Sequence, residues 1–308
     1  MTAPQYANGR IAAQSDLSGK TILVIGTAFG LGILGADGQL GKALRVAYAG
    51  DASVEFSTRN EFDLTAAASY TQRNWKNYST IINAAAYTAV DTAEETPGRK
   101  AAWAINTTAV ASLSTVAARH GITLVHVSSD YVFDGTTAEH DETESFSPLG
   151  VYGQSKAAGD AIVATVPRHY IVRTSWVIGE GNNFVRTMAS LAERGIAPGV
   201  VNDQIGRLSF TQDIAAGIKH LLTTNPDYGV YNLSNDGQSQ SWADIAADVY
   251  ELTGHNRDQV TGVSTEEYFK GKQAAPRPLN STLNLNKIKA TGFTPAPAKQ
   301  RLTEYLEK

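Results

Sequence analysis

The chain has 308 residues, of which 42% are hydrophobic and 18% charged, and its formal net charge is −4, as is ordinary for a globular protein. No basic field is present to attract nucleic acid, and the absence of cysteine excludes disulfides, thiolate catalysis and cysteine-ligated zinc. We find no apolar signal-peptide core in the first nineteen residues and no later apolar run of about eighteen residues. We therefore expect a cytoplasmic protein with no membrane, nucleic-acid or metal partner.

Two overlapping glycine loops follow a β-branched run at Thr21–Ile25. A loop that binds a pyrophosphate needs a helix directly after it, and only the second loop meets this condition, because Leu40 and Leu44 share a helical face before Gly50. We predict residues 28–34 as the strand that leads into this loop, and Thr21–Ile25 as an additional strand. The residues predicted to bind the pyrophosphate are Gly35, Gly38, Gln39, Leu40 and Gly41. A flexible glycine linker is the alternative.

The next predicted strand is Val54–Ser57, which ends just before Arg59. In a doubly wound sheet the end of this strand faces the adenosine ribose, where a cation accommodates the 2′-phosphate of NADP. Arg59 therefore favours NADPH, with NADH left open as a second cofactor, and we expect Asp63 and Leu64 to border the adenine. A solvated surface arginine is the alternative.

A clearer strand at 79–83 runs into Ala84, Ala85 and Ala86. Such small residues would let a cofactor lie against the backbone, and tight packing is an alternative compatible with that role. A long helix is predicted at 103–119. It carries Asn106, to which we assign no role.

The reactive side chains concentrate between residues 126 and 156. An apolar run at 124–127 ends at Ser128 and Ser129, and ligands bind at the carboxyl edge of open α/β sheets. Tyr152 and Lys156 are four apart in a predicted helix, so phenol and ammonium share a face. A nearby cation lowers the pKa of a phenol and suits it to general acid catalysis, while a serine hydroxyl can stabilise a carbonyl oxygen that gains charge. We predict Ser129, Tyr152 and Lys156 as catalytic residues.

A second pair with the same spacing, Tyr268 and Lys272, limits the weight of the spacing alone. No serines at a strand end precede it, and the chain runs on into glycine and proline. We therefore expect this pair on the surface.

The remaining segments complete an alternation of strands and helices, with a strand at 170–174, a helix at 211–224 and a strand at 230–233. This pattern predicts an α/β fold, a doubly wound parallel sheet of the Rossmann type with a smaller C-terminal substrate-binding region. The expected division is 20–175 for the dinucleotide-binding domain with 207–234 returning to it, 176–206 and 235–308 for the substrate-binding region, and 1–19 for an N-terminal extension. The tail, with helices at 242–253 and 299–306, is expected to cover the carboxyl edge of the sheet as a lid.

A series of short motifs occurs in a fixed order along the chain. They are GADGQLG at 35–41, NAAAYTAVDTAE at 83–94, HVSSDYVFDG at 126–135, YGQSK at 152–156, RTSWV at 173–177, NNF at 182–184, DQIG at 203–206 and RPLNS at 277–281. The series resembles the extended short-chain dehydrogenase/reductases, and within them the members that reduce dTDP-linked 4-keto-6-deoxyhexoses. The resemblance covers roughly residue 35 to the C-terminus.

This resemblance implies hydride transfer from NADPH to the C4 ketone of dTDP-4-dehydro-L-rhamnose, giving dTDP-L-rhamnose. Ser129, Tyr152 and Lys156 match the catalytic positions, and the last two also contact the cofactor. The positions that hold the sugar nucleotide are matched by Ser129, Tyr131, Trp176, Asn183 and Arg277; a buried core residue is the alternative for Trp176. The segment Arg207-Leu208-Ser209 departs from the family pattern, which usually carries Pro-Thr, and residues 1–34 have no clear counterpart.

Several alternatives stay open from the sequence. A nucleotide-sugar epimerase or dehydratase of the same family would keep its cofactor tightly bound and oxidised. A non-catalytic NADPH-binding regulatory subunit, similar to that of methionine adenosyltransferase, shares the SSDYVFDG segment. A homodimer and a fusion to, or association with, a 3,5-epimerase are also expectations.

Overall fold

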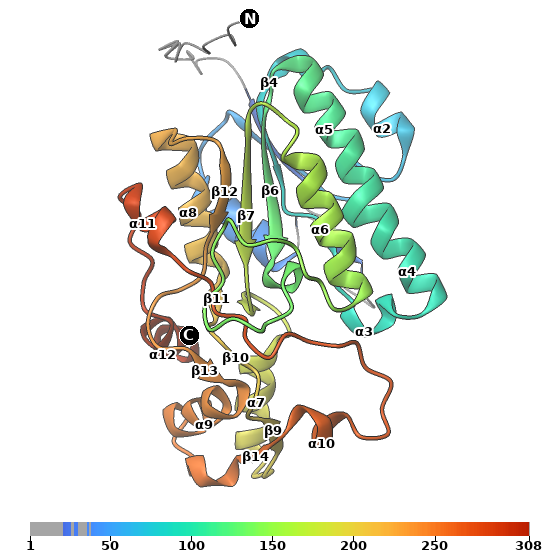
Figure 1. Cartoon of the computed structure of the whole chain (residues 1–308). Helices are drawn as coiled ribbons and strands as arrows, with labels where there is room; N and C mark the ends of the chain where they lie inside the picture. Colours follow the sequence, from blue (N-terminus) through green and yellow to red (C-terminus); the bar gives the residue numbers. More distant parts are fainter. Residues whose placement is uncertain (1–20, 26–27, 30–35, 37, 308) are drawn as a thin grey trace, which may run out of the picture.

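The computed structural model describes residues 21–25, 28–29, 36 and 38–307, and its centre is a six-stranded sheet (Figure 1). The strand order is β12-β7-β6-β4-β1-β3, and every neighbouring pair is parallel. The strands are β1 (Thr21–Ile25), β3 (Val54–Ser57), β4 (Tyr78–Asn83), β6 (Thr123–Ser129), β7 (His169–Thr174) and β12 (Gly229–Asn232). The predicted doubly wound parallel sheet is confirmed.

The chain reverses its direction of travel across the sheet between β1 and β4. It passes from β1 to β3 at one edge and then returns to β4 on the other side of β1. At such a point the loops after the two strands diverge and leave a crevice at their carboxyl ends, where ligands bind in this class of fold.

The prediction of the first strand was wrong. Thr21–Ile25 is not an additional strand: it lies between β3 and β4, with Ile22 paired to Val54 and to Thr80. The short strand β2 (Ala28–Phe29) instead pairs with β5 (Ala86–Tyr87) outside the main sheet. An uninterrupted β-branched run can pair on both sides, whereas glycines weaken the strand predicted at 28–34. Gly35 and the predicted extension at 1–19 lie outside the described residues.

Helices cover both faces of the sheet (Figure 1). One face carries α1 (Gln39–Ala47) and α8 (Thr211–Thr224), which pack on Ile82, Val125, Tyr170 and Val172. On the other face, α5 (Ala109–His120) and α6 (Val151–Val163) pack against Ile81, Leu124 and Ile171, and α4 (Thr96–Trp103) continues α5 and packs beside α6. Because both faces are covered, the central strand β6 is almost wholly buried, which explains its continuous apolar run.

A second region lies beyond the carboxyl edge of the sheet, in the lower half of Figure 1. Its core joins Val185 and Met188 of one helix to Ile245 and Val249 of another. The elements of this region are α7 (Phe184–Glu193), β9 (Gly199–Val201), β10 (Ile205–Gly206), β13 (Gln240–Ser241), α9 (Trp242–Leu252), β14 (Thr261–Val263), α10 (Thr265–Phe269) and α12 (Ala298–Leu306). The remaining described elements are α2 (Ala67–Thr71), α3 (Val90–Ala93), β8 (Val177–Ile178), β11 (Ser209–Phe210) and α11 (Asn286–Ala290), with 3-10 turns at Trp75–Asn77, Asp130–Val132 and Arg257–Gln259.

The tail is not simply a lid. Leu285 and Ile288, at the start of α11 and within it, pack into the same core as Tyr231 of β12, on a face of the sheet. Arg301 of α12 forms an ion pair with Asp213 of α8. The tail therefore belongs partly to the sheet's own hydrophobic core, because its apolar side chains are buried there.

Candidate active site

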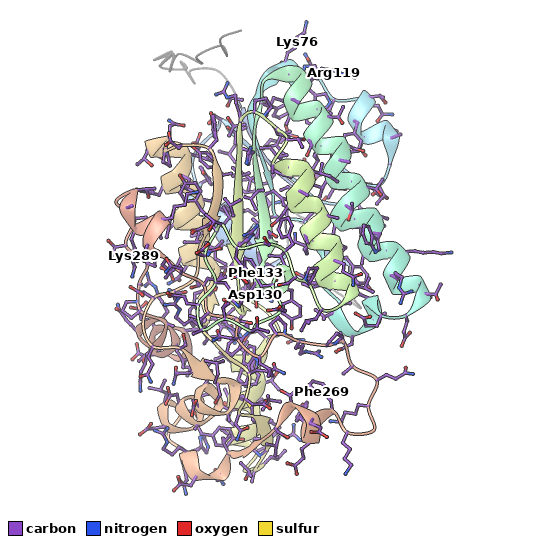
Figure 2. All side chains as sticks on the ribbon, viewed as in Figure 1. Lys76, Arg119, Asp130, Phe133, Phe269 and Lys289 are labelled. Atoms are coloured by element: carbon purple, nitrogen blue, oxygen red, sulfur yellow. The ribbon has the colours of Figure 1, made fainter. Side chains whose placement is uncertain are left out.

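A cavity of about 420 Å³ opens at the carboxyl edge of the sheet, where the two regions meet. The ends of three neighbouring strands and the N-terminal parts of α1, α3, α6 and α9 contribute to it. Its lining residues are Gly38, Gln39, Leu40, Gly41, Ala84, Ala86, Thr88, Val90, Val127, Ser128, Ser129, Asp130, Tyr131, Tyr152, Lys156, Thr174, Ser175, Trp176, Val177 and Trp242. Figure 2 shows the labelled Asp130 at this edge, between the sheet and the lower region.

The N-terminus of α1 fits the pyrophosphate of a dinucleotide. Gly38 is the N-cap, its position has no side-chain cap, and the first turn contains no acidic residue. The first backbone N–H groups of the helix can therefore bind an anion, which the helix dipole also favours. A Cβ atom on Gly41 would lie 2.8 Å from the carbonyl oxygen of Ala36, so only glycine lets the loop pack this closely on the helix.

The three alanines after β4 do not share one role. Ala84 and Ala86 line the cavity, whereas Ala85 is 2% exposed and packs in the hydrophobic core with Ile81. The prediction of a cofactor contact is therefore compatible with the position of the first and third alanines. The side chain of Ala85 serves packing instead, because it points away from the cavity.

The residues predicted to bind the adenosine end lie outside the lining of the cavity. Arg59 follows β3 by two residues, as expected, and its Nε is 3.7 Å from the carboxylate of Asp63. That carboxylate also accepts hydrogen bonds from the backbone and hydroxyl of Thr65, which lower its pKa against the effect of burial. Leu64 is 3% exposed and lies in the core beside Phe62. A contact of Leu64 with adenine is not supported by this geometry, and the role of Arg59 stays a prediction.

The predicted catalytic residues converge on the cavity. Ser129 ends β6, donates its hydroxyl to Asp130 at 2.9 Å and accepts a hydrogen bond from the backbone N–H of Tyr131. Tyr152 is in the first turn of α6, 9% exposed, with its ring edge-on to Tyr131 at 5.4 Å. Lys156, one turn further and 1% exposed, donates from Nζ to the carbonyl oxygen of Val127 at 2.7 Å.

The electrostatics of this pair differ from the sequence prediction. Burial raises the pKa of Tyr152 above its ordinary value, hydrogen bonding with Ser129 opposes the rise, and the charges of Asp130 and Asp160 add to it. In this structure the ammonium of Lys156 donates to the carbonyl oxygen of Val127, and burial lowers its pKa to about 8. The expected lowering of the Tyr152 pKa was therefore wrong for this structure. A protonated phenol is nevertheless the form that can donate a proton.

Asn106 has a structural role that the sequence did not reveal. The predicted single helix is interrupted by a π-helical turn, Ala104–Thr108, between α4 and α5. There Asn106 is 1% exposed, accepts from the backbone N–H of Tyr87, and donates to the carbonyl oxygen of Tyr87 and to the hydroxyl of Ser155. It thus joins the loop after β4 to α6, one residue before Lys156. The only signal in the sequence was an asparagine, a poor helix former, in the interior of a predicted helix.

Trp242 is a lining residue that we did not single out from the sequence. Its ring stacks on Trp176 with centroids 3.8 Å apart and planes inclined by 17°. Trp176 has a left-handed backbone with φ of 44°, and a Cβ on Gly206 would lie 2.9 Å from its ring. Because Trp176 lines the cavity, the alternative of a wholly buried core residue is not supported.

Comparison with known proteins identifies the family. The dTDP-4-dehydrorhamnose reductase of Aggregatibacter actinomycetemcomitans is 36% identical over 287 residues, 88% of this chain and 96% of that protein. The reductase of the same name from Sinorhizobium fredii is also 36% identical and covers 85% of this chain and 90% of its own length. A family model described as the RmlD substrate binding domain matches residues 31–308. The chain belongs to the dTDP-4-dehydrorhamnose reductase family.

A solved structure supports the same placement of the fold. The dTDP-4-dehydrorhamnose reductase of Bacillus anthracis, in complex with NADP, has a TM-score of 0.82 and 33% identity, and covers 94% of this chain and 99% of that one. The expected resemblance is thereby confirmed. Residues 1–30 lie outside the family match.

Two substrate positions expected from this reductase family do not line the cavity. The amide of Asn183 caps α7, accepting from the backbone N–H of Arg186 and donating to the carbonyl oxygen of Gly179 and the hydroxyl of Tyr305. These contacts leave it no free donor directed at the cavity, so a direct substrate contact is not supported. The reason is local: an asparagine directly before a helix is a favoured cap.

Arg277 lies at the rim of the cavity. Its guanidinium donates to both carboxylate oxygens of Asp91, at 2.7 and 2.9 Å, and lies 4.7 Å from the ring centre of Phe269. Its charge also acts on the pKa of Tyr131, a lining residue, which places the guanidinium near the entrance. Figure 2 labels Phe269 in the lower region of the molecule.

The departure from the reductase family at Arg207 has a structural explanation. Arg207 is 6% exposed and donates to the carbonyl oxygens of Leu283 and Gly237. The carboxylates of Asp236 and Glu139 lie within 3.6 and 3.9 Å of it. This arginine therefore ties the loop after β10 to the C-terminal part of the chain.

Within the part of the chain that the structure describes, no helix is both long and apolar enough to cross a membrane. Among the same residues, no group of three or more His, Cys, Asp or Glu side chains is arranged to hold a metal ion.

Proposed function

We propose that this chain reduces the C4 ketone of dTDP-4-dehydro-L-rhamnose with NADPH, giving dTDP-L-rhamnose, a precursor of cell-surface polysaccharide. The convergence of Ser129, Tyr152 and Lys156 on one cavity with the N-terminus of α1 is the main support. Relatives that carry the reductase name over most of the chain, and the Bacillus anthracis structure in complex with NADP, support the same reaction and cofactor.

The residues of the cavity fit a dinucleotide in an extended arrangement. Bound NADPH would supply the hydride that reduces the ketone. The uncapped N-terminus of α1, from Gly38 to Gly41, would hold the pyrophosphate, and Ala84 and Ala86 leave room beside the backbone. Lys156 would donate to the ribose hydroxyls of the nicotinamide end.

The proton would come from Tyr152. Its raised pKa keeps the phenol protonated at neutral pH, so it can donate to the alkoxide oxygen as the ketone is reduced. Ser129 would hold the same oxygen, and since it has a single O–H, that hydrogen must turn from Asp130 toward the substrate. The ammonium of Lys156 would stabilise the phenolate that remains.

The region formed by 176–206 and 235–308 would bind the sugar nucleotide. Tyr131 and Trp176 are placed to contact the sugar and base, with Trp242 stacked behind the second of them. Arg277 at the rim could exchange Asp91 for a phosphate of the substrate, since guanidinium groups bind both anions bidentately.

The direct test is to supply dTDP-4-dehydro-L-rhamnose and follow NADPH absorbance. One NADPH oxidised for each ketosugar reduced is the expected result. No net oxidation, together with a cofactor that stays bound and oxidised, would favour an epimerase or dehydratase. NADPH binding without turnover and without thermal stabilisation by a dTDP-sugar would favour a regulatory subunit.

The choice of cofactor rests on Arg59. If it binds the 2′-phosphate, Arg59→Ala should weaken kcat/KM for NADPH alone, because a charge-assisted hydrogen bond of ~1.5–3 kcal/mol corresponds to roughly one to two powers of ten. The comparison of NADPH with NADH, in the native protein and the variant, measures this preference. An equal loss for both cofactors would show that Arg59 does not read the phosphate.

Two associations remain predictions: a homodimer, and a complex or fusion with a 3,5-epimerase. The native mass of the purified protein tests the first. Co-purification of epimerase activity, and the size of the native polypeptide, test the second.

A further inference from the structure

Four polar side chains are buried together beneath the cavity, behind the catalytic residues. They are His126 of β6, Lys156 and Asp160 of α6, and Arg173 of β7, none more than 2% exposed. Of these, only Lys156 lines the cavity. Tyr152, Lys156 and Asp160 follow one another at intervals of four residues, so they lie along one face of α6.

The hydrogen bonds of Asn83 determine which nitrogen of His126 carries the proton. The side-chain oxygen of Asn83 accepts from the backbone N–H of Ala85 at 3.2 Å, which leaves its amide nitrogen facing Nδ1 of His126 at 3.1 Å. An amide nitrogen can only donate, so Nδ1 must be the acceptor. Burial lowers the pKa of His126 well below its ordinary value, and the neutral ring therefore carries its single proton on Nε2.

The Nε2–H group of His126 faces two charged side chains. It lies 3.4 Å from Nζ of Lys156 and 3.9 Å from Oδ1 of Asp160. An N–H group and an ammonium are both donors, so neither satisfies the other. The carboxylate of Asp160 is the nearby negative charge that acts on both groups, and its Oδ1 makes no hydrogen bond of its own among the described residues.

Asp160 must be ionised to fill this role. The contact of its second carboxylate oxygen, Oδ2, with an arginine supports the ionised form. Oδ2 accepts from Nε of Arg173 at 3.1 Å. A buried arginine keeps its charge and requires a counter-ion, and among the described residues Asp160 is the one carboxylate within ion-pair distance of it. Burial raises the pKa of Asp160, and the charges of Arg173 and Lys156 oppose that rise.

We propose that Asp160, acting together with His126, is a positioning residue for the reduction: its buried negative charge keeps Lys156 in the ammonium form, one helical turn from Tyr152. This inference rests on the proposed function. When the O–H bond of Tyr152 breaks, the proton passes to the alkoxide oxygen and the electron pair stays on the phenolate. The ammonium of Lys156 then stabilises that phenolate, while Asp160 and His126 keep their protonation unchanged.

The charges around Lys156 agree with this role. Its pKa is lowered to about 8 by burial, and Asp160 is the charge that opposes the lowering. The groups that face Lys156 are His126 from β6 and Tyr152 and Asp160 from α6, with Arg173 of β7 beyond the carboxylate. Without the charge of Asp160, Lys156 would lose its proton at a lower pH.

The variant Asp160→Asn tests the proposal through the pH profile of kcat. The upper limb of the profile should move to lower pH by about one unit, so that activity at pH 8 falls about fivefold while activity at pH 6.5 changes little. A structural role alone would reduce activity by the same factor at every pH, and that result would overturn the proposal.

A second variant separates the effect of the lost charge on Lys156 from destabilisation of the fold. Asp160→Asn leaves Arg173 without its counter-ion, whereas Asp160→Asn combined with Arg173→Gln removes both buried charges. The double variant should be more stable than the single one and still show the shifted limb. A double variant with the native profile would overturn the proposal.

The matched control is another Asp–Arg pair, with a buried aspartate, that lies outside the lining of the cavity. Asp213 of α8 is 6% exposed and accepts hydrogen bonds from Arg301 of α12. Asp213→Asn should lower the melting temperature without moving the pH profile. A similar shift in this control would show that the effect of Asp160→Asn is not specific.

A measurement independent of turnover follows the ring of His126 by ¹⁵N NMR. We expect the neutral ring with its proton on Nε2 throughout, and a change in the Nε2 shift near pH 8 as Lys156 loses its proton, displaced to lower pH in Asp160→Asn. A proton on Nδ1, or a shift that is the same in both proteins, would overturn the inference. If native protein fails to oxidise NADPH, the proposed function is lost while this titration still reports on the network.

Discussion

The chain contains two Tyr-x-x-x-Lys pairs, one in α6 and one at α10, and their surroundings differ completely. Tyr152 and Lys156 are 9% and 1% exposed, in a helix that packs on the sheet beside α5. Tyr268 is 40% exposed, and the ammonium of Lys272 lies 4.2 Å from the centre of its ring. The second pair lies outside the lining of the cavity, which confirms its predicted surface position.

The difference follows from how each segment is held. α6 extends over 13 residues, and Asn106 and Thr107 fix its backbone and Ser155 against the neighbouring helix. α10 has five residues and ends before Lys272, so the spacing does not even place its two side chains on one helix. Identical spacing therefore gives a buried pair in one segment and an exposed pair in the other, and the tertiary structure makes the difference.

The largest effect that would test this comparison is expected from Tyr152→Phe. The variant loses the proton donor and little packing area, so kcat should fall by ~10²–10⁴-fold. NADPH affinity, measured by fluorescence titration, should remain close to that of the native protein. A variant with nearly native turnover would mean that the buried pair is not the catalytic one.

The pH dependence of the native protein should reflect Lys156. Its pKa in the folded protein is lowered from 10.5 to about 8, so the ammonium is present below pH 8 and is lost above it. Tyr152, whose pKa is raised, does not titrate in this range. We expect kcat to fall about tenfold for each pH unit above 8. Lys272→Met should leave this profile unchanged, and a profile that changed with Lys272 would reverse the assignment of the two pairs.

The α10 region should affect substrate binding and not the chemical step. Arg277→Ala should raise the KM for the dTDP-sugar roughly 10–100-fold, as expected for a charge-assisted contact of ~1.5–3 kcal/mol. Phe269→Ala removes only the ring beneath the guanidinium and should raise the same KM about 2–5-fold. Steady-state kinetics with both substrates gives the comparison. An equal increase in the KM for NADPH would contradict a role at the substrate end.

The smallest effect is expected from Tyr268→Phe. The hydroxyl of an exposed tyrosine outside the cavity lining contributes little. We therefore expect kcat and both KM values to change by less than about twofold, and the free energy of unfolding, measured by thermal denaturation, to change by less than ~0.5 kcal/mol. A greater loss of turnover here than in Tyr152→Phe would mean that the exposed pair is the reactive one.

The sequence by itself determined the elements that depend on neighbouring residues. A β-branched run sufficed to predict Val54–Ser57, and helical periodicity sufficed for Thr211–Thr224. Residues at the ends of parallel strands and one turn apart on a helix must come together at one edge of the sheet, which is why Ser129, Tyr152 and Lys156 were predicted together.

The tertiary structure decided what depends on distant partners. The pairing of Thr21–Ile25 with β3 and β4 made this segment the first strand of the sheet. The neighbouring glycine loop had instead led to the prediction of that strand at residues 28–34. Asn106 became a buried link because a π-helical turn directs it at Tyr87 and Ser155. Asp160 reads from the sequence as one more polar residue on a helix. Its charge acts strongly on Arg173 and His126 because these residues, from other elements, are buried against it. Water, which would otherwise screen the charges, is excluded there.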